Sequence, residues 1–173
     1  MKKQNLIIAS LSLFLISLIP SSTNAQEIET NIGAMLAYGT EIENIGIGAN
    51  AEFGIMDKLS ISPSFIFYLP KETGPVKVNW FEVNANANYY FIQEEKFDVY
   101  GLGGLNYSSV KVSYDGSTLF GNDYSSSDGR FGLNLGGGAK LNLDSKITPF
   151  AELKYVIIDG GQLVLAAGVK FKI

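Results

Sequence analysis

Strict alternation of apolar residues with small or polar ones runs through most of the chain and constrains its fold more than any other feature. Between residues 45 and 55 every odd position is apolar and every even position is Gly, Asn or Glu. Side chains of a β-strand point to opposite faces at alternate positions, whereas a helix with this order would have no apolar stripe. The segment is therefore predicted to be a strand with one apolar and one polar face.

The same alternation recurs in seven further segments. The eight predicted strands span about residues 27–38, 45–55, 59–69, 78–91, 97–110, 130–142, 147–157 and 162–173. A tilted strand of about 9–11 residues is long enough to cross a bilayer. The sequence thus predicts an all-β fold, an eight-stranded antiparallel up-and-down barrel.

The connections between these strands alternate in length. Three are short and charged, at residues 56–58, 93–96 and 144–146. The other four lie at 39–44, 70–77, 111–129 and 158–161, and two of them are clearly longer. Short turns at one end and longer loops at the other are typical of transmembrane barrels of the bacterial outer membrane.

The choice between a membrane barrel and a soluble, lipocalin-like barrel depends on which face is bulky. The interior of an eight-stranded barrel is narrow and is filled by side chains. Here the polar face consists mainly of Gly, Ser and Asn, which suits that interior, while the other face carries Ile, Leu, Val, Phe and Ala. This polarity favours a barrel whose outer face contacts lipid.

Aromatic residues gather at both ends of the apolar faces, as rings that prefer the membrane–water boundary do. At the long-loop ends they are Tyr38, Phe67, Phe81, Tyr107, Phe131 and Tyr155. At the short-turn ends they are Phe53, Tyr89, Phe91, Phe97 and Phe171. We expect these residues to form two aromatic belts.

Residues 1–25 are predicted to be a cleaved secretory signal, followed by the barrel domain at 26–173. Lys2 and Lys3 precede an apolar run at 6–19, and small residues follow it up to Ala25. The alternative is a membrane helix, but the run is shorter than the roughly 20 residues that a helix needs to cross a bilayer.

Composition excludes several classes of function. The chain has 13 basic and 17 acidic residues, and removal of the signal takes two lysines away, so the net charge falls from −4 to −6. A nucleic-acid partner would require a basic face. The chain has no Cys and no His, so it lacks thiol chemistry and the general base that would activate a serine or water. We expect no enzyme activity, no cofactor and no metal site.

Seven charged residues fall on the polar face and are expected to line the barrel lumen: Glu52, Glu82, Asp98, Lys140, Glu152, Lys154 and Lys170. An unpaired charge in a narrow interior is costly, so these should pair. Pairs expected between neighbouring strands are Lys140–Glu152, Glu152–Lys170, and Lys170 or Lys172 with Glu27 or Glu29. The resulting network is interpreted as a salt-bridged plug, with an ion gate or proton path as the alternative.

The long connection at 111–129 is the best candidate for a contact surface. Tyr114, Phe120 and Tyr124 lie among Ser, Gly, Asn and Asp, a composition that can form adaptable contacts. The alternatives are a solvated loop whose aromatic residues pack on the barrel rim or on lipopolysaccharide, and a Ca²⁺ site built from its aspartates.

The chain resembles the small outer-membrane β-barrel superfamily that contains the OmpA transmembrane domain and OmpX, often labelled porin-like. The resemblance rests on the export signal, the Gly-rich passages at 100–104 and 136–140, and the ending at 168–173. Such chains usually end in an aromatic residue, whereas this one ends in Ile173 with Phe171 two positions earlier. The signal and the Lys/Ile/Asn-rich usage resemble barrels of the Bacteroidota.

Two functions are expected from this resemblance and from the polar face. The first is a non-enzymatic barrel with a plugged lumen, which supports the envelope or binds surface partners through its loops. The second is a narrow porin-like channel for ions or small solutes. The expected partners are outer-membrane lipid, lipopolysaccharide and the insertion machinery of a Gram-negative outer membrane, with the barrel as a monomer.

Overall fold

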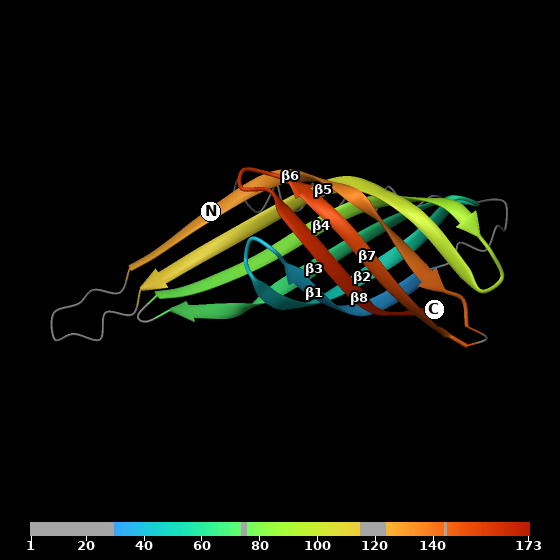
Figure 1. Cartoon of the computed structure of the whole chain (residues 1–173), viewed down its shortest axis with the longest axis horizontal. Coiled ribbons are helices and arrows are strands. Elements are labelled where there is room, and N and C mark those ends of the chain that lie inside the picture. The colour runs from blue at the N-terminus through green and yellow to red at the C-terminus, as the bar shows by residue number, and fades with distance from the viewer. Residues whose placement is uncertain (1–29, 74–75, 115–123, 144) are drawn as a thin grey trace, which may run out of the picture.

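The computed structural model describes residues 30–73, 76–114, 124–143 and 145–173. They form a closed barrel in which each of eight strands pairs antiparallel with its neighbours in chain order (Figure 1). The strands are β1 (Thr30–Gly39), β2 (Asn44–Met56), β3 (Leu59–Thr73), β4 (Val76–Gln93), β5 (Phe97–Tyr114), β6 (Tyr124–Leu141), β7 (Ile147–Ile157) and β8 (Gln162–Lys172). Among the described residues, no helix is long and apolar enough to cross a membrane. The predicted fold class and strand number are confirmed.

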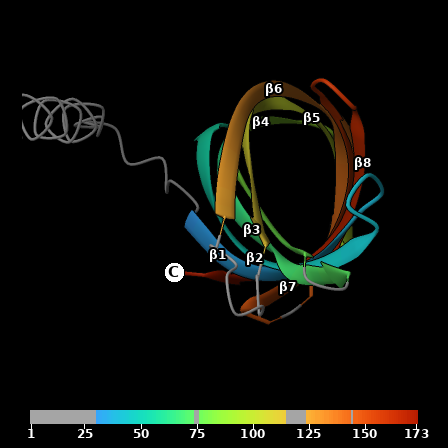
Figure 2. The ribbon, with the colours of Figure 1, turned by 90° about the vertical axis from the view of Figure 1, so that its left-hand side faces the viewer.

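The ring closes between the first and last strands. β1 pairs with β8 from Asn31 opposite Lys172 to Gly39 opposite Val164. Figure 2 shows the strands as a continuous ring around the lumen. A closed ring leaves no unpaired strand edge, which is what a bilayer requires because lipid cannot hydrogen-bond to a free backbone.

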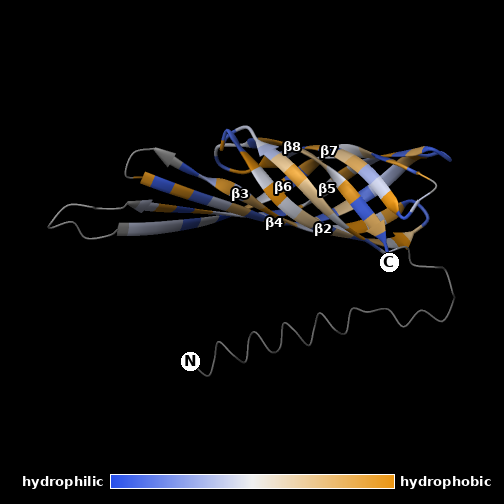
Figure 3. Cartoon of the chain, turned by 90° about the horizontal axis from the view of Figure 1, so that it is seen from below, coloured by the Kyte–Doolittle hydropathy of each residue, from blue (hydrophilic) through white to orange (hydrophobic). Residues whose placement is uncertain are grey.

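Figure 3 shows hydrophobic and hydrophilic residues alternating along the strands, and their exposed fractions place the two kinds on opposite faces of the barrel wall. On β4, Glu82, Asn84 and Asn88 face the lumen and are at most 2% exposed, whereas Val83 between them is 46% exposed. Outward-facing Phe131 reaches 82%. So many exposed apolar side chains would be unusual on a water-soluble monomer and fit a surface that contacts lipid.

The strands differ greatly in length. β4, β5 and β6 have 18 residues each and β3 has 15, whereas β1, β7 and β8 have 10 or 11. Figure 1 shows β3–β6 extending beyond the other strands at one end. We call this the long-loop end, and the opposite end, which holds the tight turns after β2, β4 and β6, the short-turn end.

The long strands correct the predicted extent of two loops. Residues 70–77 and 111–129 were expected to be loops, but β3 pairs with β4 up to Thr73 opposite Val76, and β5 pairs with β6 up to Tyr114 opposite Tyr124. The predicted boundaries followed the apolar face of the strands. Backbone hydrogen bonds need no apolar side chains, so both hairpins continue past the point where that face stops.

Gly168 of β8 lies where the barrel closes, between Met35 of β1 and Phe150 of β7. A Cβ atom at Gly168 would lie 2.1 Å from the carbonyl oxygen of Ala34. Gly168→Ala is therefore expected to reduce the free energy of unfolding in detergent by about 1–3 kcal/mol, the usual effect of overpacking. Ala167→Val, which adds more bulk on the outer face, is the control and should change it little. Equal effects of the two substitutions would contradict the inward placement of Gly168.

Candidate functional site

The lumen contains a buried carboxylate that accepts hydrogen bonds from side chains of four other strands. Glu82 of β4 is fully buried. Its Oε1 accepts hydrogen bonds from the Tyr68 hydroxyl at 3.1 Å and from Gln162 Nε2 at 2.6 Å. Its Oε2 forms an ion pair with Lys154 Nζ at 3.1 Å and accepts a longer bond from Asn106 Nδ2 at 3.4 Å. These five residues, the Glu82 cluster, tie β3, β4, β5, β7 and β8 together across the lumen.

Asparagine side chains extend the Glu82 cluster towards the middle of the barrel. Asn84 Oδ1 accepts hydrogen bonds from Lys154 Nζ at 2.8 Å, Asn106 Nδ2 at 2.8 Å and Asn134 Nδ2 at 2.9 Å. Asn134 Nδ2 also donates to Asn86 Oδ1 at 2.7 Å. Short amides on three adjacent strands thus form one hydrogen-bonded layer, which explains why the polar face is rich in Asn.

A second buried carboxylate organises the short-turn half of the lumen. Glu52 Oε2 forms an ion pair with Lys170 Nζ at 2.6 Å, and its Oε1 accepts hydrogen bonds from Ser60 at 2.7 Å and from the Tyr90 hydroxyl. Lys170 Nζ also lies 4.6 Å from the centre of the Phe150 ring, a cation–π distance. These five residues, the Glu52 cluster, join β2, β3, β4, β7 and β8.

Three further contacts involve charged residues of the lumen lining. Lys140 Nζ lies 3.4 Å from Asp98 Oδ2, which links β6 to β5. Lys140 Nζ also lies 4.6 Å from the centre of the Tyr90 ring. Tyr100 donates its hydroxyl to Glu152 Oε1 at 2.6 Å. The structure therefore places all seven predicted charged residues in the lumen, and each of them has a charged or hydroxyl partner there.

Two of the predicted ion pairs are nevertheless wrong. Lys140–Glu152 and Glu152–Lys170 are not among the ion pairs of the described residues, in which Lys140 pairs with Asp98 and Lys170 with Glu52. The prediction paired residues on neighbouring strands at similar heights. In a narrow lumen a long lysine side chain also reaches strands across the barrel, as Lys154 does from β7 to β4. Glu27 and Glu29 lie outside the described residues.

Sequence reasoning missed the large rings in the lumen. Tyr68 and Tyr100 are at most 1% exposed, and Phe150 is 5% exposed. Each stands opposite an inward-facing glycine of a neighbouring strand: Tyr68 opposite Gly46, Tyr100 opposite Gly138 and Phe150 opposite Gly168. A Cβ at Gly138 would lie 2.6 Å from the Tyr100 ring, so the glycine provides the space for it. The alternation of the sequence does assign these rings to the inner face, so their position in the lumen could have been predicted from it.

All eleven predicted belt residues lie at outward-facing positions. Neighbouring rings touch on the outer surface: the Phe81 and Tyr107 centres are 6.3 Å apart, those of Tyr107 and Phe131 are 5.0 Å apart, and those of Tyr89 and Phe91 are 5.3 Å apart. That the belts mark the two membrane boundaries stays a prediction.

The predicted loop contacts fall at the ends of the longest hairpin. Tyr114 and Tyr124 are the last paired residues of β5 and β6. Phe120 lies outside the described residues. The surface-binding role of Tyr114, Phe120 and Tyr124 stays a prediction.

The charged groups of the lumen are fixed by ion pairs and hydrogen bonds to one another and to neighbouring side chains. The buried lysines and carboxylates are bound to each other or to hydroxyl and amide groups, which holds their charges in place. Within the described ranges, no three or more His, Asp or Glu side chains gather as they would around a metal ion.

Comparisons with known proteins agree with this architecture. The family model described as "Outer membrane protein beta-barrel domain" matches residues 14–171. The N-terminal barrel of Pseudomonas aeruginosa OprF superposes with a TM-score of 0.66 at 16% identity, covering 84% of this chain and 97% of that one. Neisserial surface protein A gives 0.62 at 17%, covering 84% and 97%. Ail, the attachment invasion locus protein of Yersinia pestis, gives 0.53 at 20%, covering 83% and 97%. No curated protein sequence matches the chain.

The Glu82–Lys154 pair offers a direct test of the network. Glu82→Gln keeps one carbonyl oxygen for Tyr68 and Gln162 but leaves the Lys154 ammonium buried without a counter-charge. We expect it to reduce the free energy of unfolding by about 3–5 kcal/mol in a denaturant titration of the refolded barrel. The double variant Glu82→Gln/Lys154→Met removes both charges and should recover much of that loss.

The control for this test is Glu43→Gln, which breaks the exposed Glu43–Lys71 pair at the rim. Its effect should be far smaller because solvent screens exposed pairs. If Glu82→Gln destabilises the barrel no more than Glu43→Gln does, the lumen pair does not hold the strands together.

Proposed function

Since the chain belongs to the outer membrane protein β-barrel domain family, we propose that it is a non-enzymatic barrel whose lumen is plugged by its own side chains. In this role the barrel contributes to the structure of the outer membrane and presents its long-loop end to surface partners. Outer-membrane lipid and lipopolysaccharide surround it, the outer-membrane insertion machinery assembles it, and it acts as a monomer.

The observation that best supports a plugged lumen is that two clusters of bonded side chains cross the lumen at two levels. The Glu82 cluster joins five strands in the long-loop half, and the Glu52 cluster joins five in the short-turn half. Tyr68 and Tyr100 are almost fully buried between the strands. An ion would have to displace these rings and separate buried ion pairs, which is costly in a poorly hydrated interior.

The alternative, a narrow channel for ions or small solutes, would require a continuous polar path. Open lumens usually occur in barrels with more strands, because the diameter of a barrel grows with strand number. Six of the seven charges in the described part of the lumen compensate one another in pairs, and the seven do not form a ring of one sign, the arrangement typical of charge-selective pores. These features favour the plug over the pore.

Planar-bilayer recordings separate the two functions. We expect the wild-type barrel to show no steady single-channel openings. The double variant Glu82→Ala/Lys154→Ala removes the ion pair at the centre of the Glu82 cluster and should produce brief or steady openings, whereas Glu43→Ala at the rim should not. Steady openings of the wild type whose conductance changes with Glu152→Gln would contradict the plug.

A surface role through the longest hairpin can be tested by shortening it. Residues 111–114 and 124–129 are paired strand, so the deletion is confined to residues 115–123, with a two-residue turn in their place. We expect the variant to keep the heat-modifiable gel migration of a folded barrel and to lose binding to lipopolysaccharide or to immobilised host matrix proteins. A variant that folds and binds these surfaces as the wild type does would show that the loop is not the contact surface.

A further inference from the structure

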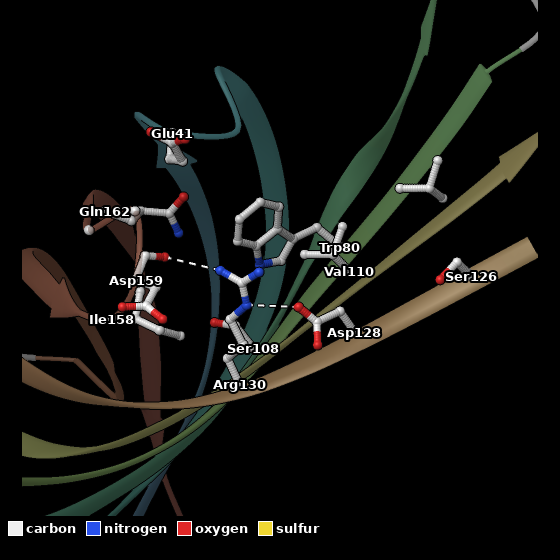
Figure 4. Close-up of a pocket in the computed structure, with 13 residues that line it drawn as sticks. Glu41, Trp80, Ser108, Val110, Ser126, Asp128, Arg130, Ile158, Asp159 and Gln162 are labelled. Carbon is white, nitrogen blue, oxygen red and sulfur yellow. Dashed lines mark hydrogen bonds and ion pairs between the residues drawn. The ribbon is translucent and has the colours of Figure 1, made fainter.

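The unequal strand lengths create a cup at the long-loop end of the lumen. β4, β5 and β6 rise above the turns that follow β1 and β7, so the inner face of this wall looks across at those turns. A cavity of about 470 Å³ lies between them (Figure 4). Its size is within the range of about 300–1,000 Å³ that is usual for small-molecule sites in proteins.

Strand register places the lining of the wall in rows. Trp80 of β4, Val110 of β5 and Asp128 of β6 are directly opposite one another, and Ser108 and Arg130 form the row below. Ile158 and Gln162, at the β7–β8 turn, line the other side of the cavity. The cup therefore combines an indole ring and aliphatic side chains with a few polar groups, a composition typical of sites for small molecules.

Arg130 is held in place within the cup. Its Nε lies 2.8 Å from Asp128 Oδ2, and its Nη1 donates to the carbonyl oxygen of Asp159 at 3.4 Å (Figure 4). The ion pair compensates the guanidinium charge. Glu41 and Asp159 also line the cavity, so acidic groups outnumber basic ones there.

Two buried polar atoms of the cup have no hydrogen-bond partner among the described residues. They are the Trp80 Nε1 donor and the Gln162 Oε1 acceptor. Gln162 is only 3% exposed, and its Nε2 donates to Glu82 at 2.6 Å. Because a carboxylate can only accept, this bond fixes the amide and leaves Oε1 as the free acceptor. Figure 4 shows the Gln162 amide directed towards the Trp80 side of the cavity.

We propose that this cup binds a neutral monosaccharide or disaccharide. A pyranose ring presents an apolar C–H face, which can stack on Trp80, and hydroxyl groups that both donate and accept hydrogen bonds. Such hydroxyls offer the acceptor that Trp80 Nε1 lacks and the donor that Gln162 Oε1 lacks. An anion would meet the excess of carboxylates, and an alkylammonium ion would offer no acceptor to the Trp80 N–H.

Trp80 is the only tryptophan of the chain, so its fluorescence, excited at wavelengths that tyrosine does not absorb, reports on this cup alone. The experiment uses the refolded barrel in a detergent without a sugar headgroup and titrates glucose, galactose, N-acetylglucosamine and maltose. We expect at least one of these sugars to change the Trp80 emission saturably, with a dissociation constant of about 1 mM or tighter. Inorganic phosphate and tetramethylammonium should have no saturable effect.

Variants with matched controls test whether the sugar binds in the cup. Val110→Phe fills the cup while leaving Trp80 in place and should weaken sugar binding at least tenfold, whereas Val83→Phe, on the lipid-facing side of β4, should leave it unchanged. Arg130→Gln breaks the ion pair with Asp128 and the bond to Asp159 that fix this side of the cup, and should also weaken binding. Its control is Lys71→Gln, which removes the same charge from an exposed pair outside the cup. Heat-modifiable migration verifies folding of each variant, and Arg130→Gln suffices if Val110→Phe does not fold.

Three outcomes would overturn the proposal. The first is the absence of a saturable response to any of the four sugars. The second is a response to phosphate or tetramethylammonium alone, which would assign the cup to a charged ligand. The third is a sugar response that survives both Val110→Phe and Arg130→Gln, which would place the binding elsewhere on the barrel.

Discussion

The narrow closed lumen is the constraint on which the rest of the structure depends. Eight strands leave space only for side chains, and every charge placed there must find a partner because water is largely excluded. The chain meets this demand with two carboxylates, Glu82 and Glu52, each paired with a lysine and with a tyrosine hydroxyl. Glycines opposite the large rings provide the remaining space. The pairing of charges and the filling of the lumen thus depend on each other, since a side chain such as Tyr90 both occupies volume in the lumen and donates a hydrogen bond to a carboxylate.

The outer surface and the long-loop end follow from different requirements. The outer face must be apolar only over the height of the bilayer. Backbone pairing has no such limit, and β4–β6 continue as a wall above the shorter strands. The same difference in length that corrected the predicted loops also encloses the cup around Trp80 and Arg130. A barrel with strands of equal length would have no wall at its mouth to form such a cavity.

Much of the fold could be predicted because alternation is a local property. The order of residues from Ile45 to Ile55 already separates the lumen side from the lipid side, and the structure retains that division on all eight strands. The pairing of Lys154 with Glu82 could not be predicted in this way. Their positions are 72 residues apart, on strands that are not neighbours in the sheet. Whether a lysine reaches the adjacent strand or one across the lumen depends on barrel diameter, strand tilt and the rings that occupy the space between.

The sequence by itself determined the strands, their two faces, the inward position of the seven charged residues and the absence of histidine chemistry, since these depend on residue type and on a period of two. Only the tertiary structure decided which charges pair, how far the hairpins rise and which polar atoms are left without partners at the mouth. The physical reason is that these properties depend on distances across the closed ring. Register and closure set those distances, whereas the local order of residues does not.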